Sequence, residues 1–254
     1  MSKKGLLYLL AGVMIVAIIS LFYLVSRPSN GALEDNLPRY MSEETYNMTP
    51  PPASPDPNPL PDQNPHKYKS VTTTVFWVGE GADESNDFIP NDKSFWDSSW
   101  MEHYGGIDDP EDRCGYRPCS FVPKENPFYF ALPYGDREEE GDQKSSVKLI
   151  PWFGRSQKES ILKNVWIEIK YKDKTCYAQW QDVGPFETDD FEYVFGDAPP
   201  KNTFGVAAGL DISPAAWDCL GLRTNAAVQW RFVDEGKVPD GPWKEVVTTR
   251  DVSF

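Results

Sequence analysis

The sequence predicts a mainly β domain, a small barrel with long loops and one short helix, preceded by an N-terminal transmembrane helix. Four segments have the β-branched and aromatic composition of strands, and one compact helix signal lies between the last two of them. An uncharged run near the N-terminus predicts the membrane span. A proline-rich stretch separates the two, so we divide the chain into residues 1–27, 28–69 and 70–254.

The N-terminal run predicts a single membrane span. Gly5–Val25 carries no charged side chain, and Lys3 and Lys4 precede it. Twenty-one helical residues extend roughly 31 Å, about the thickness of a hydrocarbon core. The run is long for a signal peptide and no A-x-A cleavage site follows, which favours an uncleaved signal anchor over a cleaved signal. The positive-inside rule then places the domain outside the cytoplasm, in the periplasm or at the cell surface.

The second zone, residues 28–69, predicts a spacer. It contains ten prolines, most of them between Thr49 and Pro65. Proline removes a backbone donor and fixes φ, so this stretch forms neither helix nor sheet. A polyproline-like chain extends about 3.1 Å per residue and holds the following domain away from the membrane. A role as a ligand for proline-motif readers is the alternative.

The third zone, residues 70–254, is long enough for one sizeable hydrophobic core. In Val165–Ile169 the residues Val165, Ile167 and Ile169 share one face, so Trp166 points to solvent or to a groove. The last predicted strand alternates in the same way, with apolar side chains on one face. The predicted strands are Val71–Val78, Val165–Ile169, Thr175–Gln181 and Ala226–Val233.

One helix is well signalled and one long region is not. Ser213 predicts the N-cap, Pro214 the first helical position and Gly221 the C-terminal stop. The stretch Gly79–Lys148 is rich in Gly, Pro and Asp. We therefore expect it to form long loops around the barrel rather than a second domain.

The number of cysteines predicts disulfides, as is typical of an exported domain. All four lie in the third zone, and an even number in an oxidising compartment predicts disulfides. Cys114 and Cys119 are close enough in the chain for a local bridge, and Cys176 and Cys219 would join the helix to a strand. The alternative is that Cys176 and Cys219 are small buried apolar side chains without a bridge.

The charge balance excludes some partners. The chain has 25 basic and 39 acidic residues, which gives a net charge of −14. A nucleic-acid binder neutralises phosphates with a basic surface, so we expect no nucleic-acid partner. Two histidines and four cysteines leave little for a metal site, and we expect neither metal nor cofactor. The acidic runs Asp108–Asp112, Arg137–Asp142 and Glu187–Asp190 lack the EF-hand pattern, so solvated loops are favoured over calcium sites.

The order of motifs from Val165 to Val233 resembles a known family. A strand ends in QDVGPF at Gln181–Phe186, an insertion follows, and GLDISPAAWDCLGL at Gly209–Leu222 leads into the strand VQWRFV. This order is similar to that of the double-psi β-barrels of expansins, bacterial expansin-like proteins, rare lipoprotein A and membrane-bound lytic transglycosylase A. Thr72–Glu80 looks like the opening strand of that family. The second, carbohydrate-binding domain of expansins has no counterpart after the last predicted strand.

The resemblance implies a fold and a site. The fold would be a six-stranded double-psi β-barrel, with Asp182 and Asp211 at the mouth of one groove. By this resemblance Asp211 would be the catalytic acid and Asp182 its electrostatic partner. One protonated carboxyl suffices for a lytic transglycosylase, because a hydroxyl of the sugar replaces water. Groove residues that would contact substrate are Thr74, Phe76, Trp77, Trp166, Trp180 and Phe186.

Local patterns allow plainer roles for the same residues. Asp182 in Asp-Val-Gly-Pro is typical of a turn residue that bonds its own backbone. Asp211 lies where a carboxylate stabilises a helix N-terminus. Each aromatic side chain fits core packing as well as sugar stacking.

The function expected from these observations is binding or remodelling of a cell-wall polysaccharide, of the peptidoglycan type, outside the cytoplasm. Its partners would be the wall glycan and, through the N-terminal helix, the membrane. Glycan cleavage by aspartate acid catalysis and non-catalytic binding in the same groove both remain open. A third alternative is a structural or interaction protein that presents acidic loops on a barrel scaffold. Whether Asp182 and Asp211 face one open groove is the observation that bears most directly on this choice.

Overall fold

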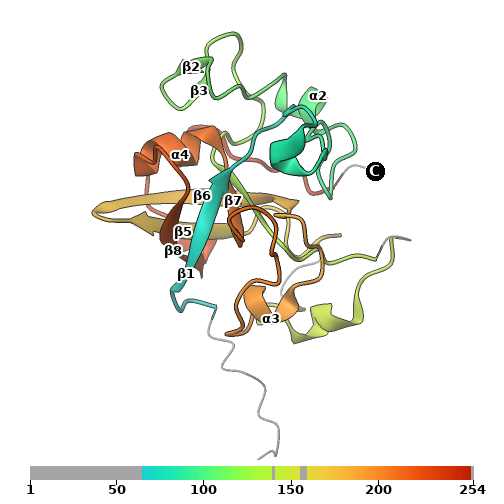
Figure 1. Cartoon of the computed structure of the whole chain (residues 1–254). Coiled ribbons are helices and arrows are strands. Elements are labelled where there is room, and N and C mark those ends of the chain that lie inside the picture. Colours follow the sequence, from blue (N-terminus) through green and yellow to red (C-terminus); the bar gives the residue numbers. More distant parts are fainter. Residues whose placement is uncertain (1–64, 139–140, 155–158, 253–254) are drawn as a thin grey trace, which may run out of the picture. The chain divides into compact units, whose positions relative to one another are not determined.

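The computed structural model describes residues 65–138, 141–154 and 159–252, and they build a closed barrel of six strands (Figure 1). Around the barrel the strands follow the order β1-β7-β4-β6-β5-β8. Their bounds are β1 (Lys69–Val75), β4 (Tyr129–Leu132), β5 (Trp166–Tyr171), β6 (Lys174–Val183), β7 (Leu210–Ile212) and β8 (Ala226–Val233). The predicted transmembrane helix and all but the last residues of the linker lie outside the described part of the chain. Among the helices that are described, none has the length and apolarity of a membrane span.

Two of the six strand pairs are parallel. β1 runs parallel to β7, and β4 runs parallel to β6, whereas the remaining neighbours are antiparallel. In this register Thr74 of β1 pairs with Asp211 of β7. Ala131 of β4 pairs with Asp182 on one side and with Asp211 on the other. The barrel therefore brings two aspartates that lie 29 positions apart in the chain to either side of one alanine.

The strands rich in β-branched and aromatic residues form where the sequence predicts them. β8 has the predicted bounds, and β5 and β6 differ from prediction by a few residues at their ends. β1 begins at Lys69 and ends at Val75, before the predicted end at Val78. The predicted helix is α4 (Pro214–Leu220): the Ser213 hydroxyl accepts a hydrogen bond from Ala216 N, and Gly221 ends the helix at φ 66°.

Two strands of the barrel, β4 and β7, were not predicted from the sequence. β4 lies inside Gly79–Lys148, which we expected to form loops only. All four of its residues are buried, so it lacks the alternation that marks a half-exposed strand. β7 has three residues and lies directly before α4. A period-two pattern cannot identify either strand, because β4 is buried throughout and β7 has only three residues.

The remaining regular elements are short. α2 (Trp100–Tyr104) and α3 (Phe191–Val194) add two helices to the single one predicted, and each has at most five residues. A small hairpin of β2 (Arg113–Cys114) and β3 (Arg117–Pro118) lies beside α2 at one end of the barrel, and α3 lies near the other end (Figure 1). The 3₁₀ helices are Glu84–Asn86, Ser145–Leu149, Glu235–Lys237 and Pro242–Lys244.

Large aromatic side chains fill the barrel. Trp180 is fully buried and stacks between Phe130 and Phe232, with ring centroids 5.6 and 5.9 Å apart. Trp230 lies in the same cluster, and its indole donates to the Tyr193 hydroxyl. Rings of this size bury about 150–250 Å² each, so they supply much of the apolar surface removed from water.

Both predicted disulfides are present. Cys114–Cys119 closes the small hairpin, and Cys176–Cys219 joins β6 to α4. No described cysteine is free. Cys219 therefore fixes α4, which begins three residues after Asp211, against β6, which carries Asp182 next to its last residue.

The first residue of the acidic run Asp108–Asp112 is buried, whereas Asp109 and Glu111 are exposed as expected of a solvated loop. Asp108 is fully buried, forms an ion pair with Arg113 and accepts a hydrogen bond from the Tyr129 hydroxyl at 2.9 Å. Burial raises the pKa of Asp108, and the Arg113 charge opposes that rise. This contact holds the loop after α2 onto β4.

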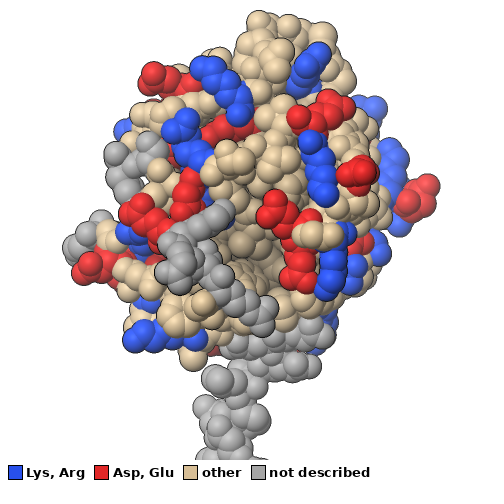
Figure 2. Space-filling model, turned by 180° about the vertical axis from the view of Figure 1, so that it is seen from behind, with Lys and Arg blue, Asp and Glu red and all other residues tan. Residues whose placement is uncertain are grey.

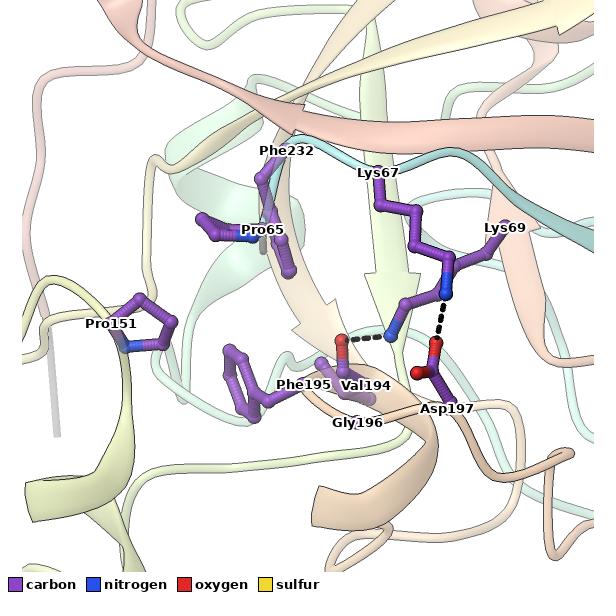
Figure 3. Close-up of a pocket in the computed structure, with 9 residues that line it drawn as sticks. All are labelled: Pro65, Lys67, Lys69, Pro151, Val194, Phe195, Gly196, Asp197 and Phe232. Atoms are coloured by element: carbon purple, nitrogen blue, oxygen red, sulfur yellow. Dashed lines mark hydrogen bonds and ion pairs between the residues drawn. The ribbon is translucent and has the colours of Figure 1, made fainter. Parts of the chain in front are cut away.

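A half-buried lysine lies at the end of the barrel where β1 begins (Figure 3). Lys69 Nζ donates to the carbonyls of Tyr193 and Val194 at 2.5 and 2.7 Å, at the C-terminal end of α3. Partial burial lowers the pKa of Lys69 to about 8. The space enclosed beside it is about 10 Å³, which is no more than one water molecule needs. A separate cavity of about 530 Å³ adjoins it, with Pro65, Pro151, Phe232 and Trp166 among its lining residues.

Charged side chains are mixed on the surface. Figure 2 shows Lys and Arg interspersed with Asp and Glu over one face, without a continuous basic area. Such a face gives phosphates no aligned set of positive charges.

Candidate functional site

A groove of about 600 Å³ opens at the end of β1, beside the ends of β6 and β7. Its floor carries three carboxyl side chains, and its walls are mostly apolar. Predicted site residues that line it are Thr74, Phe76, Trp77, Asp182, Phe186 and Asp211. Residues that the sequence did not single out are Glu80, Phe95, Ile89, Phe204 and Val206.

The spacing of the two aspartates follows from the strand register. Residues paired across neighbouring strands project to the same face of a sheet. Asp182 and Asp211 both pair with Ala131, so all three project to one side. Two strand spacings separate the aspartate backbones by roughly 10 Å. The small alanine between them leaves room for a ligand to lie between the two carboxyl groups.

Asp211 is half-buried at the groove floor. Its carboxylate accepts a hydrogen bond from the Thr74 hydroxyl, on the neighbouring strand β1. Burial raises the pKa of Asp211 to about 6, and the bond from Thr74 limits the rise. The helix N-terminus is capped by Ser213 instead, so capping of α4 does not explain Asp211.

Asp182 is 9% exposed and lies at the end of β6. Its Oδ1 accepts a hydrogen bond from the backbone N–H of Phe95 at 2.7 Å, a contact that joins the strand to a loop 87 residues away. Burial raises the pKa of Asp182 to about 7, backbone hydrogen bonds from Phe95 and Val183 oppose the rise, and the Asp211 charge adds to it. Burial thus raises the pKa of both aspartates.

Glu80 is a third carboxyl in the groove, and sequence patterns gave no reason to select it. It is 8% exposed, and Asn91 Nδ2 donates to its Oε2 at 2.7 Å. Burial raises the pKa of Glu80 to about 7. Hydrogen bonds from Asn91 and the Trp77 backbone oppose this rise, whereas the negative charges of Asp211 and Asp83 add to it. Only the folding of the loop after β1 brings Glu80 near Asp211, so no local signal marks it.

Two predicted groove residues lie elsewhere. Trp180 projects into the barrel core, between Phe130 and Phe232. Trp166 is 2% exposed and lies on β5, away from the groove. As predicted, Trp166 projects to the opposite face from Ile167 and Ile169. The C-terminal segment around Thr248 covers that face: the Thr248 N–H and carbonyl both bond to the side chain of Gln179, which pairs with Trp166 across the strands. A strand periodicity cannot show which outer face a later segment will cover.

The described residues hold no group of His, Cys, Asp or Glu side chains arranged to bind a metal ion. No protein-family model matches the chain, and no curated protein is significantly similar to it.

The groove can donate and accept protons near neutral pH. A carboxyl with a pKa of about 7 holds its proton where an ordinary aspartate has lost it. A second carboxyl with a pKa of about 6 is then largely ionised. Two carboxyl groups in different protonation states that flank the bond are the arrangement of most glycoside hydrolases.

Proposed function

We propose that the protein binds and remodels a cell-wall polysaccharide of the peptidoglycan type, and that it cleaves the glycan by acid catalysis. The observation that supports this most directly is the groove in which Asp182 and Asp211 lie on either side of Ala131, with raised pKa values. Raised pKa values of neighbouring carboxyls in a cleft are typical of catalytic sites.

We further propose that the barrel is a double-psi β-barrel. The closed six-stranded barrel with parallel pairs β1–β7 and β4–β6 supports this assignment. The position of Asp182 at the end of β6, and of Asp211 just before α4, agrees with the motif order of that family.

The burial of the two aspartates supports a division of roles. Asp182 is 9% exposed, lies beside the charge of Asp211 and has backbone N–H groups as partners, so it is the general acid that protonates the leaving oxygen of the glycosidic bond. Asp211 is half-buried and accepts a hydrogen bond from Thr74, so it is the ionised partner, whose negative charge stabilises the positive charge that develops on the sugar ring. A hydroxyl of the same sugar then attacks the anomeric carbon and returns its proton to Asp182. These roles are the reverse of those that the resemblance implied.

The proposed location is outside the cytoplasm, with residues 1–27 as the membrane anchor and the proline-rich segment as a spacer. β1 begins at Lys69, where the chain leaves that segment, and the groove lies at its other end. A seven-residue strand spans roughly 20 Å. The groove thus opens at the opposite end of β1 from Lys69.

Turnover of wall glycan tests this proposal. The full chain in detergent or membranes is incubated with purified cell wall, and soluble glycan fragments are measured. We expect Asp182→Asn to lower the rate by roughly 100-fold or more, since general acid catalysis contributes about 10²–10⁴. Asp218→Asn, a change on the exposed face of α4, is the matched control and should not affect the rate.

Wall binding by the same proteins separates the alternatives. If the wild type binds wall without releasing fragments, the protein is a binding module and the catalytic part of the proposal is wrong. If it neither binds nor cleaves wall, the whole proposal fails and an interaction protein on a barrel scaffold is the better interpretation.

A further inference from the structure

The groove has an exposed aromatic shelf that the sequence motifs did not predict. The rings of Phe186 and Phe204 lie 4.5 Å apart, centroid to centroid, and are 37% and 39% exposed. Val206 beside them is 50% exposed, and all three line the groove. Several large apolar side chains exposed side by side on a soluble protein usually mark a site that a ligand or partner covers.

The backbone fixes the shelf in place. Phe186 has φ 61°, a left-handed conformation that is unfavourable for a bulky side chain. A hydrogen bond from Glu187 N to the Pro185 carbonyl, 2.7 Å long, closes this turn. Phe204 N donates to the Asn202 side chain, and Asn202 in turn donates to the Ala208 carbonyl. Both rings are therefore held at the groove edge by the folded chain.

The opposite wall is also apolar. Ile89 is 49% exposed, and Pro90 and Phe95 continue the wall toward Asp182. Backbone hydrogen bonds hold this loop: Gly79 N donates to the Asn91 carbonyl, and Asn91 N donates to the Glu80 carbonyl. The groove thus combines apolar walls with a polar, hydrogen-bonding floor. A sugar ring has the matching distribution, with C–H groups on its faces and hydroxyls around its edge.

The charges around the groove select against acidic sugars. Among the described residues that line it, Glu80, Asp182 and Asp211 are acidic and Lys93 is the basic one. Lys93 is exposed, so water screens its charge. A carboxylate or phosphate on the ligand would meet the negative charge of Asp211 and, above about pH 7, that of Glu80 and Asp182 as well, without a buried cation to pair with it.

We infer that the shelf of Phe186, Phe204 and Val206 stacks against the face of an uncharged sugar ring, so that the groove takes neutral glycan segments and rejects acidic ones. This inference rests on the proposed function and names the class of glycan. Phe204 and Val206 belong to the insertion between the two aspartate motifs. The insertion therefore sets specificity, while the barrel supplies the carboxyls.

Binding of soluble oligosaccharides to the full chain tests the inference. The probes are neutral N-acetylglucosamine oligomers and cello-oligosaccharides, with oligogalacturonates as the acidic counterpart, and calorimetry measures the affinity. We expect a neutral probe to bind, and Phe204→Ala and Phe186→Leu each to weaken that binding by tenfold or more. Oligogalacturonates should bind at least tenfold more weakly than the neutral probe.

Phe88→Ala is the matched control. Phe88 is 65% exposed and has φ 60°, nearly the same backbone conformation as Phe186, but it does not line the groove. This change should leave the affinity unaltered, and thermal unfolding of each variant verifies its fold. Phe204 has an ordinary backbone conformation, so Phe204→Ala tests the shelf even if Phe186 variants do not fold.

The outcomes separate this inference from the proposed function. If the wild type binds or cleaves wall but Phe204→Ala retains full affinity, or if acidic probes bind as tightly as neutral ones, the inference is wrong and the proposed function stands. If the wild type binds no wall and no oligosaccharide, the proposed function fails, and the inference fails with it.

Discussion

Two neighbouring strands of the barrel each carry a buried carboxyl, and the two differ in what surrounds them. Glu168 of β5 accepts hydrogen bonds from the Tyr68 hydroxyl at 2.6 Å and from two nitrogens of Arg231 at 2.5 and 2.9 Å. Lys170 Nζ lies 3.1 Å from it. Asp182 of β6 is nearly as buried, but it has backbone N–H groups and no positive charge as partners.

The difference appears in the pKa values. Burial by itself would raise the pKa of Glu168, but the hydrogen bonds from Tyr68, Arg231 and Lys170 outweigh it and lower the pKa. At Asp182 burial prevails and the pKa rises to about 7. Glu168 therefore favours folding when ionised, whereas Asp182 opposes folding when ionised. A barrel can keep a reactive carboxyl because paired charges and disulfides elsewhere provide stability.

The disulfides provide the largest expected effect. Replacing Cys176 and Cys219 together by Ala should lower the free energy of unfolding by about 4 kcal/mol, and replacing Cys114 and Cys119 together by about 2 kcal/mol, because the closed loops differ in length. Urea unfolding of the two double variants measures both. Equal losses would contradict the dependence on loop length, and four free thiols in the unreduced, unfolded protein would show that neither bridge forms.

Asp182→Asn should make the protein more stable at neutral pH. The folded-state pKa of Asp182, about 7, lies above its unfolded value, so the folded form holds a proton that the unfolded form has lost between about pH 4 and 7. Stability of the wild type consequently falls as pH rises through this window, and the deficit is complete above pH 7. We expect a gain on the order of 2–4 kcal/mol at pH 8 and almost none at pH 4.

Denaturant titrations of Asp182→Asn and of the exposed-residue control Asp218→Asn at these two pH values measure the gain. A variant that is less stable than the wild type at pH 8 would mean that the ionised Asp182 carboxylate supports the fold, and the contrast with Glu168 would disappear.

Glu168→Gln should have the opposite sign and the opposite pH dependence. The lowered folded-state pKa of Glu168 stabilises the protein above its unfolded pKa, and this contribution is lost as pH falls through the folded-state value. Because Arg231 is partly exposed, solvent screening limits the expected loss to about 1–2 kcal/mol at pH 7. The loss should shrink toward pH 3. A loss that stays constant over this range would indicate a packing effect rather than a charge effect.

The sequence by itself determined the elements with strong local signals. β8 and α4 formed where alternation and capping residues predicted them, because side-chain periodicity and the groups at a helix end act over a few residues. The short spacing of Cys114 and Cys119 favoured a local bridge, whereas the bridge between Cys176 and Cys219 was one of the alternatives that the sequence left open. Asp182 and Asp211 were identified from motif order, and both line the groove.

The remaining features of the fold and of the groove depend on contacts between distant segments. β4 was invisible because a four-residue, fully buried strand has no period, and Ala131, which separates the aspartates, lies in it. Glu80 and Phe204 reach the groove through loops, whose end points no local pattern specifies. Trp166 and Trp180 have the composition of ligand platforms, but packing with distant segments buries them. The raised pKa values of the aspartates likewise depend on burial and on neighbours contributed by other strands, and these exist only once the barrel has closed.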